Sequence, residues 1–166
     1  NLKKIYIPNT VKKIGRYAFS GCNSLSDVSL SNNIVKLENG VFIKCSNLKE
    51  IIIPEGIKEI GDNVFQNCVN LKKITFPKSL EKIGKSSFSY VNIDNLQISS
   101  ENINFINQNG ILLGENKKII VLVTTSAIQN GNFTIPETVE KLEEGVLIAF
   151  SQIKRVIVPE SVKEIN

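Results

Sequence analysis

The sequence contains no histidine, no methionine and no tryptophan. Without histidine, the commonest general base is missing, and neither a Ser–His nor a Cys–His nucleophile pair can form within this chain. The sequence also has no Cys-x-x-Cys pair, so the usual ligand sets for zinc are lacking. No run of about 18 apolar residues occurs, which is the length that a membrane-spanning helix needs. We therefore expect no cofactor, no metal site and no membrane insertion.

Other features typical of enzymes are also scarce. Glu143 and Glu144 are adjacent carboxylates, but their positions hold lysine or asparagine elsewhere in the chain, as on a solvated surface. Gly15, Gly61 and Gly84 stand far apart, so they do not form a phosphate-binding glycine loop. The sequence therefore predicts that this chain is not an enzyme.

Cysteine and net charge are low. Three cysteines are too few for the dense disulfide framework of a small secreted domain. The 20 basic and 16 acidic residues leave a net charge of +4. Nucleic-acid binding calls for basic residues clustered on one face, and the modest net charge does not indicate it. We expect no nucleic acid among the partners.

What the sequence does contain is a repeat of 23 residues. Cys22, Cys45 and Cys68 mark it, because each cysteine follows the previous one by 23 residues. Apolar residues recur with the same spacing. The aligned sets include Leu2, Leu25, Leu48 and Leu71; Ile5, Val28, Ile51 and Ile74; and Phe19, Phe42, Phe65 and Phe88. A fixed period of about 20 to 50 residues is typical of a solenoid, in which each coil buries its apolar edge against its neighbours.

The repeat organises one domain, residues 1–166, into about seven coils. Regular coils cover residues 1–92, and an irregular coil covers 93–130, beginning at Ile93 with its apolar positions one residue early. Regular coils return over 131–166. Because the chain opens and stops inside a repeat, we expect a fragment of a longer protein. Uncapped ends of this kind would allow end-to-end self-association.

Each coil has the same local pattern. Apolar residues at alternate positions, such as Ile51 and Ile53, predict a short strand with one buried face. The proline that follows, here Pro54, ends the strand because it has no N–H to donate. A glycine such as Gly61 would permit a second corner through its backbone freedom. Residues 62–68 are then predicted to form one short helical turn.

The irregular coil carries an insertion of its own. Its apolar runs 111–113 and 119–123 flank Gly114-Glu115-Asn116-Lys117, which predicts a β-hairpin. The apolar residues of the hairpin 111–123 would either project as a contact surface or cover part of the core, and we favour the core. Asn132-Phe133-Thr134 matches a glycosylation sequon, but such tripeptides arise readily by chance, and we give it no weight.

The consensus of the coils reads Leu-x-x-Ile-x-Ile-Pro-x-x-Val-x-x-Ile-Gly-x-x-(Ala/Val)-Phe-x-x-Cys, most clearly over residues 2–22 and 48–68. This pattern resembles the BspA-like (Treponema pallidum type) leucine-rich repeats. The resemblance implies a leucine-rich-repeat solenoid, a right-handed α/β superhelix that is mostly β, with a parallel sheet on one face. It also implies a surface or secreted protein with a role in adhesion.

The sequence departs from that pattern at several positions. Ser31 replaces the proline, Glu38 replaces the glycine, and Val91 and Phe150 replace the cysteine. The asparagine column of ordinary leucine-rich repeats is missing. Its place is taken by mostly small polar residues, which we expect to satisfy backbone groups at the corner. They are Thr10, Asn33, Gly56, Ser79, Thr138 and Ser161.

The cysteine column has two interpretations. Stacked coils would bring neighbouring cysteines about 5 Å apart, close enough for a disulfide. Val91 and Phe150 occupy the same position in other coils, however, which indicates an apolar pocket. A free cysteine behaves there as a small hydrophobic residue. We favour buried thiols and leave one bridge open.

The side chains that point away from the core on the predicted sheet form the candidate ligand-binding face. They are Lys4, Tyr6, Asp27, Ser29, Glu50, Ile52, Lys73, Thr75, Asn95, Gln97, Arg155 and Ile157. Their charges are mixed in sign and Tyr6 is the one aromatic ring, which favours a protein ligand over nucleic acid or a stacked sugar. The alternative is a solvated face with no ligand.

Two functions follow for this chain. The first is a non-catalytic protein-binding or adhesion module of a cell-surface or secreted protein, with a host, matrix or other cell-surface protein as partner. The second is a structural spacer that presents other domains and binds nothing. Seven short strands offer on the order of 450 Å², whereas a standard interface takes about 800 Å² from each partner. Tight binding would need a longer array or repeated contacts.

Overall fold

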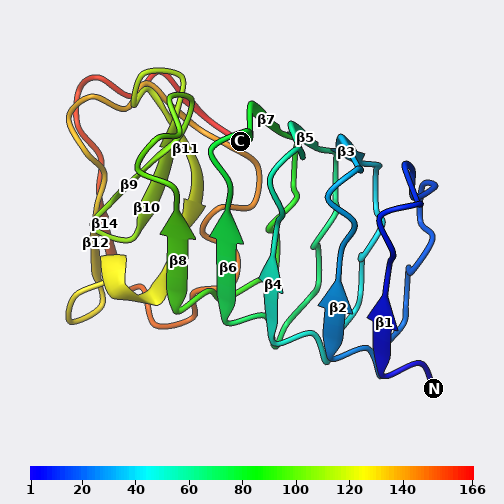
Figure 1. Ribbon diagram of the computed structural model, residues 1–166. Coiled ribbons are helices and arrows are strands. Elements are labelled where there is room, and N and C mark those ends of the chain that lie inside the picture. The colour runs from blue at the N-terminus through cyan, green and yellow to red at the C-terminus, as the bar shows by residue number, and fades with distance from the viewer.

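The computed structural model describes residues 1–166, which wind into a stack of coils with one strand at the front of each coil (Figure 1). The front strands are β1 (Lys4–Tyr6), β2 (Asp27–Ser29), β4 (Glu50–Ile52), β6 (Lys73–Phe76), β8 (Asn95–Ile98), β12 (Asn132–Thr134) and β14 (Arg155–Ile157). The back strands are β3 (Lys36–Leu37), β5 (Glu59–Ile60), β7 (Lys82–Ile83), β13 (Lys141–Leu142) and β15 (Glu164–Ile165). The prediction of a mostly β solenoid with about seven coils is confirmed.

Strand pairing follows the period of the sequence. Strand β1 pairs with β2 in parallel, with Lys4 opposite Asp27, and β4 pairs with β6, with Glu50 opposite Lys73. In the β6–β8 pair, Lys73 lies opposite Asn95, one residue short of the period. The early start of the fifth coil is therefore confirmed as a shortened coil that keeps its strand in register.

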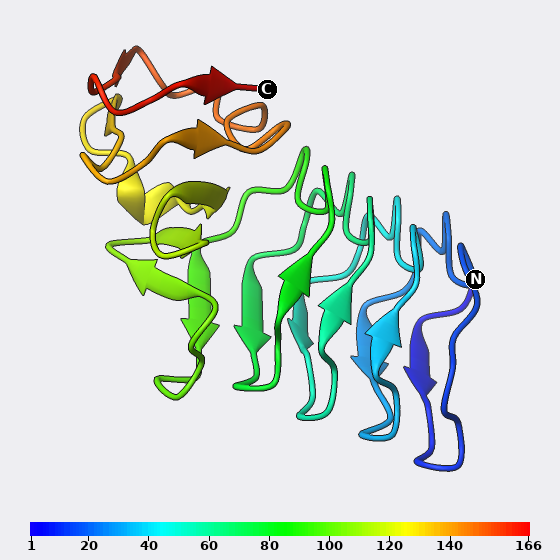
Figure 2. The same ribbon diagram turned by 90° about the horizontal axis from the view of Figure 1, so that it is seen from above.

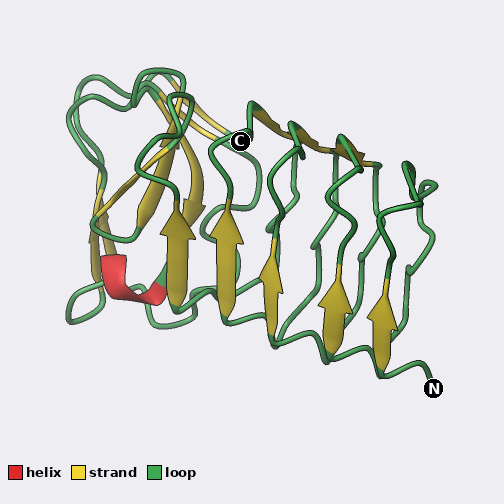
Figure 3. Ribbon diagram, viewed as in Figure 1, coloured by secondary structure: helices red, strands yellow, loops and turns green.

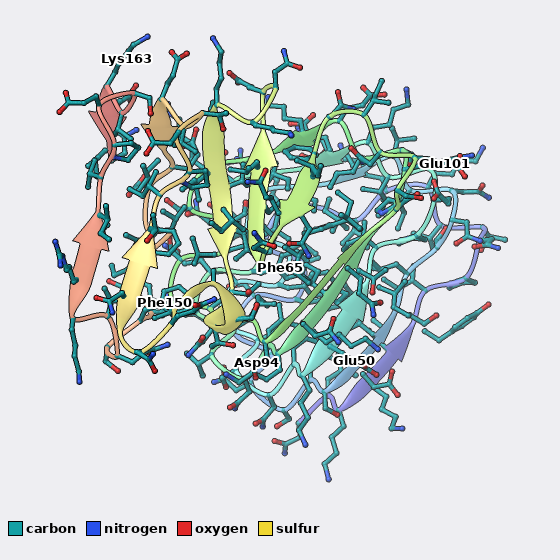
Figure 4. The ribbon with its side chains drawn as sticks, turned by 90° about the vertical axis from the view of Figure 1, so that its left-hand side faces the viewer. Glu50, Phe65, Asp94, Glu101, Phe150 and Lys163 are labelled. Atoms are coloured by element: carbon teal, nitrogen blue, oxygen red, sulfur yellow. The ribbon has the colours of Figure 1, made fainter.

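A column of stacked phenylalanine rings runs through the first four coils. The ring centroids of Phe19, Phe42, Phe65 and Phe88 follow one another at 5.6, 5.9 and 5.6 Å with interplanar angles of 11°, 6° and 18°. Phe42 and Phe65 are completely buried, and Figure 4 shows Phe65 in the interior. Aromatic pairs of this kind contribute about 0.5–1.5 kcal/mol each beyond area burial, so the column ties successive coils together.

The helical turn predicted for residues 62–68 is wrong. The segment forms two successive tight turns, with Asn63 and Asn67 at positive φ. The N–H groups of Asn63, Phe65 and Asn67 donate to carbonyls of the next coil, each at 3.0 Å. The N–H groups of Gln66 and Cys68 donate three residues back instead. Because alternate donors serve the next coil, they are not free for the continuous i→i−4 bonds of a helix.

The corner glycines serve close packing between coils rather than backbone freedom. Gly61 and Gly84 do not adopt positive φ, contrary to the predicted role. A Cβ added at Gly84 would lie 2.5 Å from the carbonyl carbon of Gly61, and one at Gly61 would lie 2.9 Å from the Leu37 oxygen. Gly15 lies in the first coil and has open space around it. The glycine column therefore exists because one backbone passes directly over the next.

The small polar column satisfies backbone groups at the corner in several coils, as expected. Asn33 Nδ2 donates to the Asn9 carbonyl at 2.6 Å, and Ser79 Oγ donates to the Ile57 carbonyl at 2.9 Å. Thr138 Oγ1 donates to the Lys117 carbonyl at 3.1 Å. Ser161 Oγ is buried without a partner, Thr10 makes no side-chain hydrogen bond and Gly56 has no side chain, so the expectation holds in the coils of Asn33, Ser79 and Thr138.

The predicted hairpin is confirmed and forms part of the core. It consists of β10 (Ile111–Gly114) and β11 (Ile119–Val123), paired in an antiparallel arrangement, and β9 (Ile106–Gln108) adds a third strand that the sequence did not reveal. Leu112 and Leu122 pack into a larger N-terminal core, whereas Leu113 and Ile120 pack into a smaller C-terminal core. The hairpin is a wall with a core on each side, which explains its uninterrupted apolar runs.

The stack changes direction at this wall. Figure 2 shows the last two coils turned away from the axis of the first four. Strand β11 pairs with β13, so the sheet order β15-β13-β11-β10-β9 carries the back of the solenoid onward from the hairpin. The insertion therefore produces a bend and two cores in place of one straight stack.

One short helix interrupts the front of the molecule. It is η1 (Thr125–Ala127), a single 3₁₀ turn that lies beside β8 (Figure 3). Thr125 N–H donates to the Ile93 carbonyl at 3.0 Å, and Thr125 Oγ1 donates to Asp94 Oδ1 at 2.9 Å. With three residues, this helix falls far short of the length that a bilayer crossing demands.

The front strands do not form one continuous sheet. They are joined as β1-β2, β4-β6-β8 and β12-β14. No backbone hydrogen bond joins β2 to β4, although both strands belong to regular neighbouring coils. At the back of the same coils, β3, β5 and β7 are paired without interruption. The stack therefore has an unbonded seam at its front between the second and third coils.

Candidate binding surface

The exposed surface of the front strands, called here the front face, carries the side chains predicted for it. Ten of the twelve predicted residues are exposed, and Lys73 and Thr75 are half-buried. They stand in two columns along the stack. The first column contains Lys4, Asp27, Glu50, Lys73, Asn95 and Arg155, and the second contains Tyr6, Ser29, Ile52, Thr75, Gln97 and Ile157.

Two members of the front face escaped the sequence prediction. Asn132 lies opposite Arg155 and Thr134 lies opposite Ile157, and both residues are exposed. The signal was present, because Phe133-Thr134-Ile135-Pro136 aligns with Val156-Ile157-Val158-Pro159 in the sequence. The two columns therefore continue past the irregular coil into the C-terminal coils.

The alternation of side chains along each strand positions the front face. In β4, Ile51 is buried while Glu50 and Ile52 are exposed. Successive side chains of a strand point to opposite faces, so burying Ile51 fixes the outward direction of its neighbours. Figure 4 shows Glu50 and Asp94 at the outside of the molecule, whereas Phe65 lies in the interior.

Ion pairs link neighbouring coils in the first column. Lys4 Nζ lies 3.2 Å from Asp27 Oδ2, and Lys73 Nζ lies 3.6 Å from Glu50 Oε2. Exposed pairs of this kind contribute about 0–1 kcal/mol each, because solvent screens them. Asp27 on β2 and Glu50 on β4 flank the seam. Each forms its ion pair with a lysine of the coil on the side away from the seam. The charges on either side of the seam have the same sign.

The second column carries three exposed apolar side chains, Ile157 in the last coil and Tyr6 and Ile52 near the seam. Tyr6 is 73% exposed and Ile52 is 63% exposed. Ser29 belongs to the coil between them and is much smaller. Thr75 Oγ1 donates to Gln97 Oε1 at 3.2 Å, so these two polar side chains of the column bond to each other. Large apolar groups left in water beside unoccupied space are typical of interaction surfaces.

A groove of about 890 Å³ opens on the front face along the seam. Its lining includes backbone and side chains of β2 and β4 together with basic residues from three coils. Its charged members are Lys4, Asp27, Lys49, Glu50, Lys72 and Lys73. Lys49 has no carboxylate partner, whereas Lys72 lies 3.9 Å from Asp94. The groove is therefore net positive.

Two further hollows lie near the bend. One of about 800 Å³ contains no charged residue and is lined mainly by amide and hydroxyl groups, among them Gln108, Asn130 and Asn132. The other, of about 460 Å³, lies where coil 4 meets the last two coils, next to Tyr90 and Ile148. Neither hollow combines free backbone groups with exposed apolar side chains, as the seam does.

The cysteine column is structural in its surroundings. Cys45 and Cys68 are completely buried, and Cys22 is partly buried. Cys45 Sγ donates to the Phe19 carbonyl and Cys68 Sγ to the Phe42 carbonyl, each at 3.1 Å. Burial, with a smaller contribution from the neighbouring thiol, raises the pKa of Cys45 to about 12. The pKa of Cys68 is also raised, mainly by burial. Thiols held neutral in this way are poor nucleophiles.

Away from the front face, charged residues form ladders between coils. Glu140 accepts from Lys163 at 2.8 Å and pairs with Lys118 at 2.9 Å. Hydrogen bonds from Lys163 and then Lys118 lower the pKa of Glu140 to about 2. No group of three or more cysteine, aspartate or glutamate side chains is arranged to hold a metal ion. These ladders connect neighbouring coils.

The repeat has a counterpart among known families. The family model described as the BspA type leucine rich repeat region matches residues 1–111 and 124–166 in six copies. The interval between these ranges contains most of β10, the hairpin turn and all of β11. None of the curated proteins compared with the chain matches its sequence.

Several solved structures share the fold. The pneumococcal vaccine antigen PcpA is 21% identical with a TM-score of 0.74, and 98% of this chain covers 46% of it. A leucine-rich repeat protein from Eubacterium ventriosum is 22% identical with a TM-score of 0.71, and 92% of this chain covers 46% of it. A leucine rich cell surface protein from Faecalibacterium prausnitzii is 18% identical with a TM-score of 0.61, and 99% of this chain covers 54% of it. The chain spans about half the length of each.

Proposed function

Because the chain belongs to the BspA-type leucine-rich repeat family, we propose that it is a non-catalytic protein-binding module of a cell-surface or secreted protein. The partner is a protein on a host, in a matrix or on another cell. The front face is the binding surface. Leucine-rich repeat solenoids generally serve protein–protein interaction, and the family is typically found on surface proteins, which supports the proposal.

The observation that carries the proposal is the front face itself. It presents two ordered columns of side chains, with Tyr6 and Ile52 exposed among charged neighbours. Aromatic and aliphatic groups surrounded by polar residues form the usual centre of a protein interface. A pure spacer has no need for large apolar groups in water, so this feature favours a binder.

The expected partner is engaged by an extended array. The front strands offer on the order of 450 Å², less than the 800 Å² or so of a standard interface. This chain also spans about half of the similar solved structures. Repeated weak contacts along a longer array raise the overall affinity without any single strong site, which suits adhesion.

A charge swap tests the proposal without removing an ion pair. The double variant Glu50→Lys/Lys73→Glu reverses two charges on the front face and keeps their pairing. The matched control, Lys58→Glu/Glu81→Lys, swaps a pair at 2.9 Å away from the front strands. Binding to a panel of extracellular matrix proteins and to intact cells is measured by surface plasmon resonance and by flow cytometry.

The front-face swap is expected to weaken binding at least tenfold, and the control swap is expected to leave it unchanged. Equal binding by both swapped proteins and by the wild-type chain would support the spacer instead. A spacer would also show no saturable binding to any member of the panel. Circular dichroism spectra of both swapped proteins are compared with that of the wild-type chain, and matching spectra exclude misfolding as the cause of either result.

A further inference from the structure

We propose that the groove along the seam between β2 and β4 binds an extended acidic peptide segment of the partner, with one bulky apolar side chain. This inference rests on the proposed function and specifies the chemistry of its partner. Two features of the groove carry it, exposed apolar side chains at its edge and an excess of positive charge, and the unbonded seam sets its place.

Strand β4 directs backbone groups into the groove. Ile53 N–H donates to the carbonyl of Thr75 on β6 at 2.9 Å. Alternate residues of a parallel strand bond to the same neighbour, so Ile51 also bonds toward β6, and Glu50 and Ile52 direct their N–H and C=O groups toward β2. No backbone hydrogen bond to β2 meets them.

Strand β2 has the complementary arrangement. Ile7 N–H donates to the Ser29 carbonyl at 2.9 Å, so Asp27 and Ser29 bond toward β1. Val28 therefore directs its N–H and C=O toward β4, where they have no backbone partner. Strands β2 and β4 nevertheless lie closer together than the roughly 10 Å that an inserted strand would need, so a peptide would lie over the seam and not within the sheet.

The second column forms a notch at the edge of the groove, which Ser29 and Ile52 line and beside which Tyr6 stands, opposite Ser29. Tyr6 and Ile52 stand two strands apart, about 10 Å at the usual strand spacing, and Ser29 leaves the space between them open. A gap of that width accepts one bulky apolar side chain. Exposed aromatic and aliphatic walls on both sides would bury it, which is how a peptide-recognition groove selects alternate side chains.

The positive charge of the groove indicates that the ligand is negatively charged. Asp27 and Glu50 are already paired, with Lys4 and Lys73 respectively. Lys49 lines the groove with no carboxylate partner. Lys72 is paired with Asp94 outside the lining, so the unpaired Lys49 gives the groove its positive excess, which attracts an anionic segment and repels a basic one. A carboxylate of the peptide would complete the pairing of Lys49.

Peptide pools test the chemistry of the ligand. Twelve-residue peptides are arrayed in three pools that share leucine and phenylalanine and differ in carrying Asp/Glu, Lys/Arg or Ser/Gly. The chain is expected to retain the acidic pool in preference to the other two, and its binding should fall as salt rises. Retention of the basic pool, equal retention of all three, or no retention of any peptide overturns the proposal.

Variants locate the site. Ser29→Phe fills the notch and Lys49→Glu reverses the unpaired charge, and each should lower the affinity for the selected acidic peptides at least tenfold. The matched controls are Ser151→Phe, in an exposed turn outside the front strands, and Lys154→Glu before β14, and both should bind as the wild-type chain does. Amide NMR signals of Val28, Glu50 and Ile52 should shift on titration. Equal effects of site and control variants would overturn the proposal.

The outcomes separate this inference from the proposed function. If Ser29→Phe and Lys49→Glu leave partner binding intact while Arg155→Glu/Ile157→Glu abolishes it, the front face is a binding surface and the seam is not its site. If no variant of the front face changes the capture of any matrix protein or cell, the proposed function fails together with this inference.

Discussion

Asn102 is the side chain that fastens the irregular coil to the coil before it. Its Nδ2 donates to the carbonyls of Pro77 at 2.9 Å and Leu80 at 3.0 Å. Its Oδ1 accepts from the N–H groups of Asn104 at 2.9 Å and Phe105 at 2.8 Å. It lies 23 residues after Ser79, in the small polar column, where the second coil also has an asparagine, Asn33.

Replacing Asn102 should therefore destabilise the molecule strongly. Asn102→Ala leaves several part-buried backbone groups without partners and should lower the free energy of unfolding by about 1–3 kcal/mol. Urea unfolding followed by circular dichroism measures the change. Asn70→Ala is the control, because Asn70 makes one exposed hydrogen bond, to the Ser46 carbonyl. Equal destabilisation by the two variants would contradict the role assigned to Asn102.

The thiols should differ in reactivity according to their burial. The raised pKa of Cys45, about 12, and the raised pKa of Cys68 keep both thiols neutral at pH 8. In the native protein, Cys22 should react rapidly with a thiol reagent such as DTNB, and the other two should react only as the chain unfolds. Three thiols should titrate in denaturant. Fewer than three would reveal a disulfide and contradict the buried-thiol interpretation.

At the scale of the element, the strands and the corners of each coil have different origins. The strands follow from alternation and proline, which are local features, and the sequence predicted them. The corner at 62–68 satisfies its donors through the next coil, at 3.0 Å from Asn63, Phe65 and Asn67. No local pattern encodes a partner 22 residues away, and the same short apolar spacing fits a helical turn. The helical prediction failed for this reason.

The ladder of Lys118, Glu140 and Lys163 connects three elements at the back of the C-terminal coils, and it should respond to pH. The pKa of Glu140 is about 2 in the folded protein, against an ordinary value of 4.5. A depressed pKa contributes stability above pH 4.5, and this contribution is lost as pH falls through about 2.

Urea midpoints of the wild-type chain and of Glu140→Gln should therefore differ at pH 7 and converge near pH 2. Glu137→Gln, at an exposed position without an ion pair, is the control and should match the wild-type midpoint throughout. A difference between Glu140→Gln and the wild-type chain that persists unchanged to pH 2 would show that the ladder does not act through ionised Glu140.

At the scale of the whole molecule, the hairpin wall divides the interior into two cores. The larger core runs through the first four coils to Leu112 and Leu122, and the smaller includes Phe133 and Leu142. In a solenoid each coil is stabilised by its neighbours, so a wall between two cores sets a boundary for local unfolding.

Phe133→Ala should test that boundary. Removing a completely buried phenylalanine ring should cost about 3–5 kcal/mol. Hydrogen exchange should then lose protection over residues 124–166 and keep it over residues 24–92. Phe42→Ala, in the larger core, should produce the opposite pattern. A uniform loss of protection along the chain in both variants would mean that the two cores unfold as one unit.

The sequence by itself determined the period, the number of coils, the strand positions, the hairpin and the outward direction of twelve front-face residues. These depend on which residues repeat and alternate, and a repeat places them on the same surface in every coil. Tertiary structure alone decided the unbonded seam, the bend, the two cores and the reason for the glycines at Gly61 and Gly84. Each of these depends on how one backbone meets another across coils, and the 23-residue spacing, which is the same on both sides of the seam, does not indicate it.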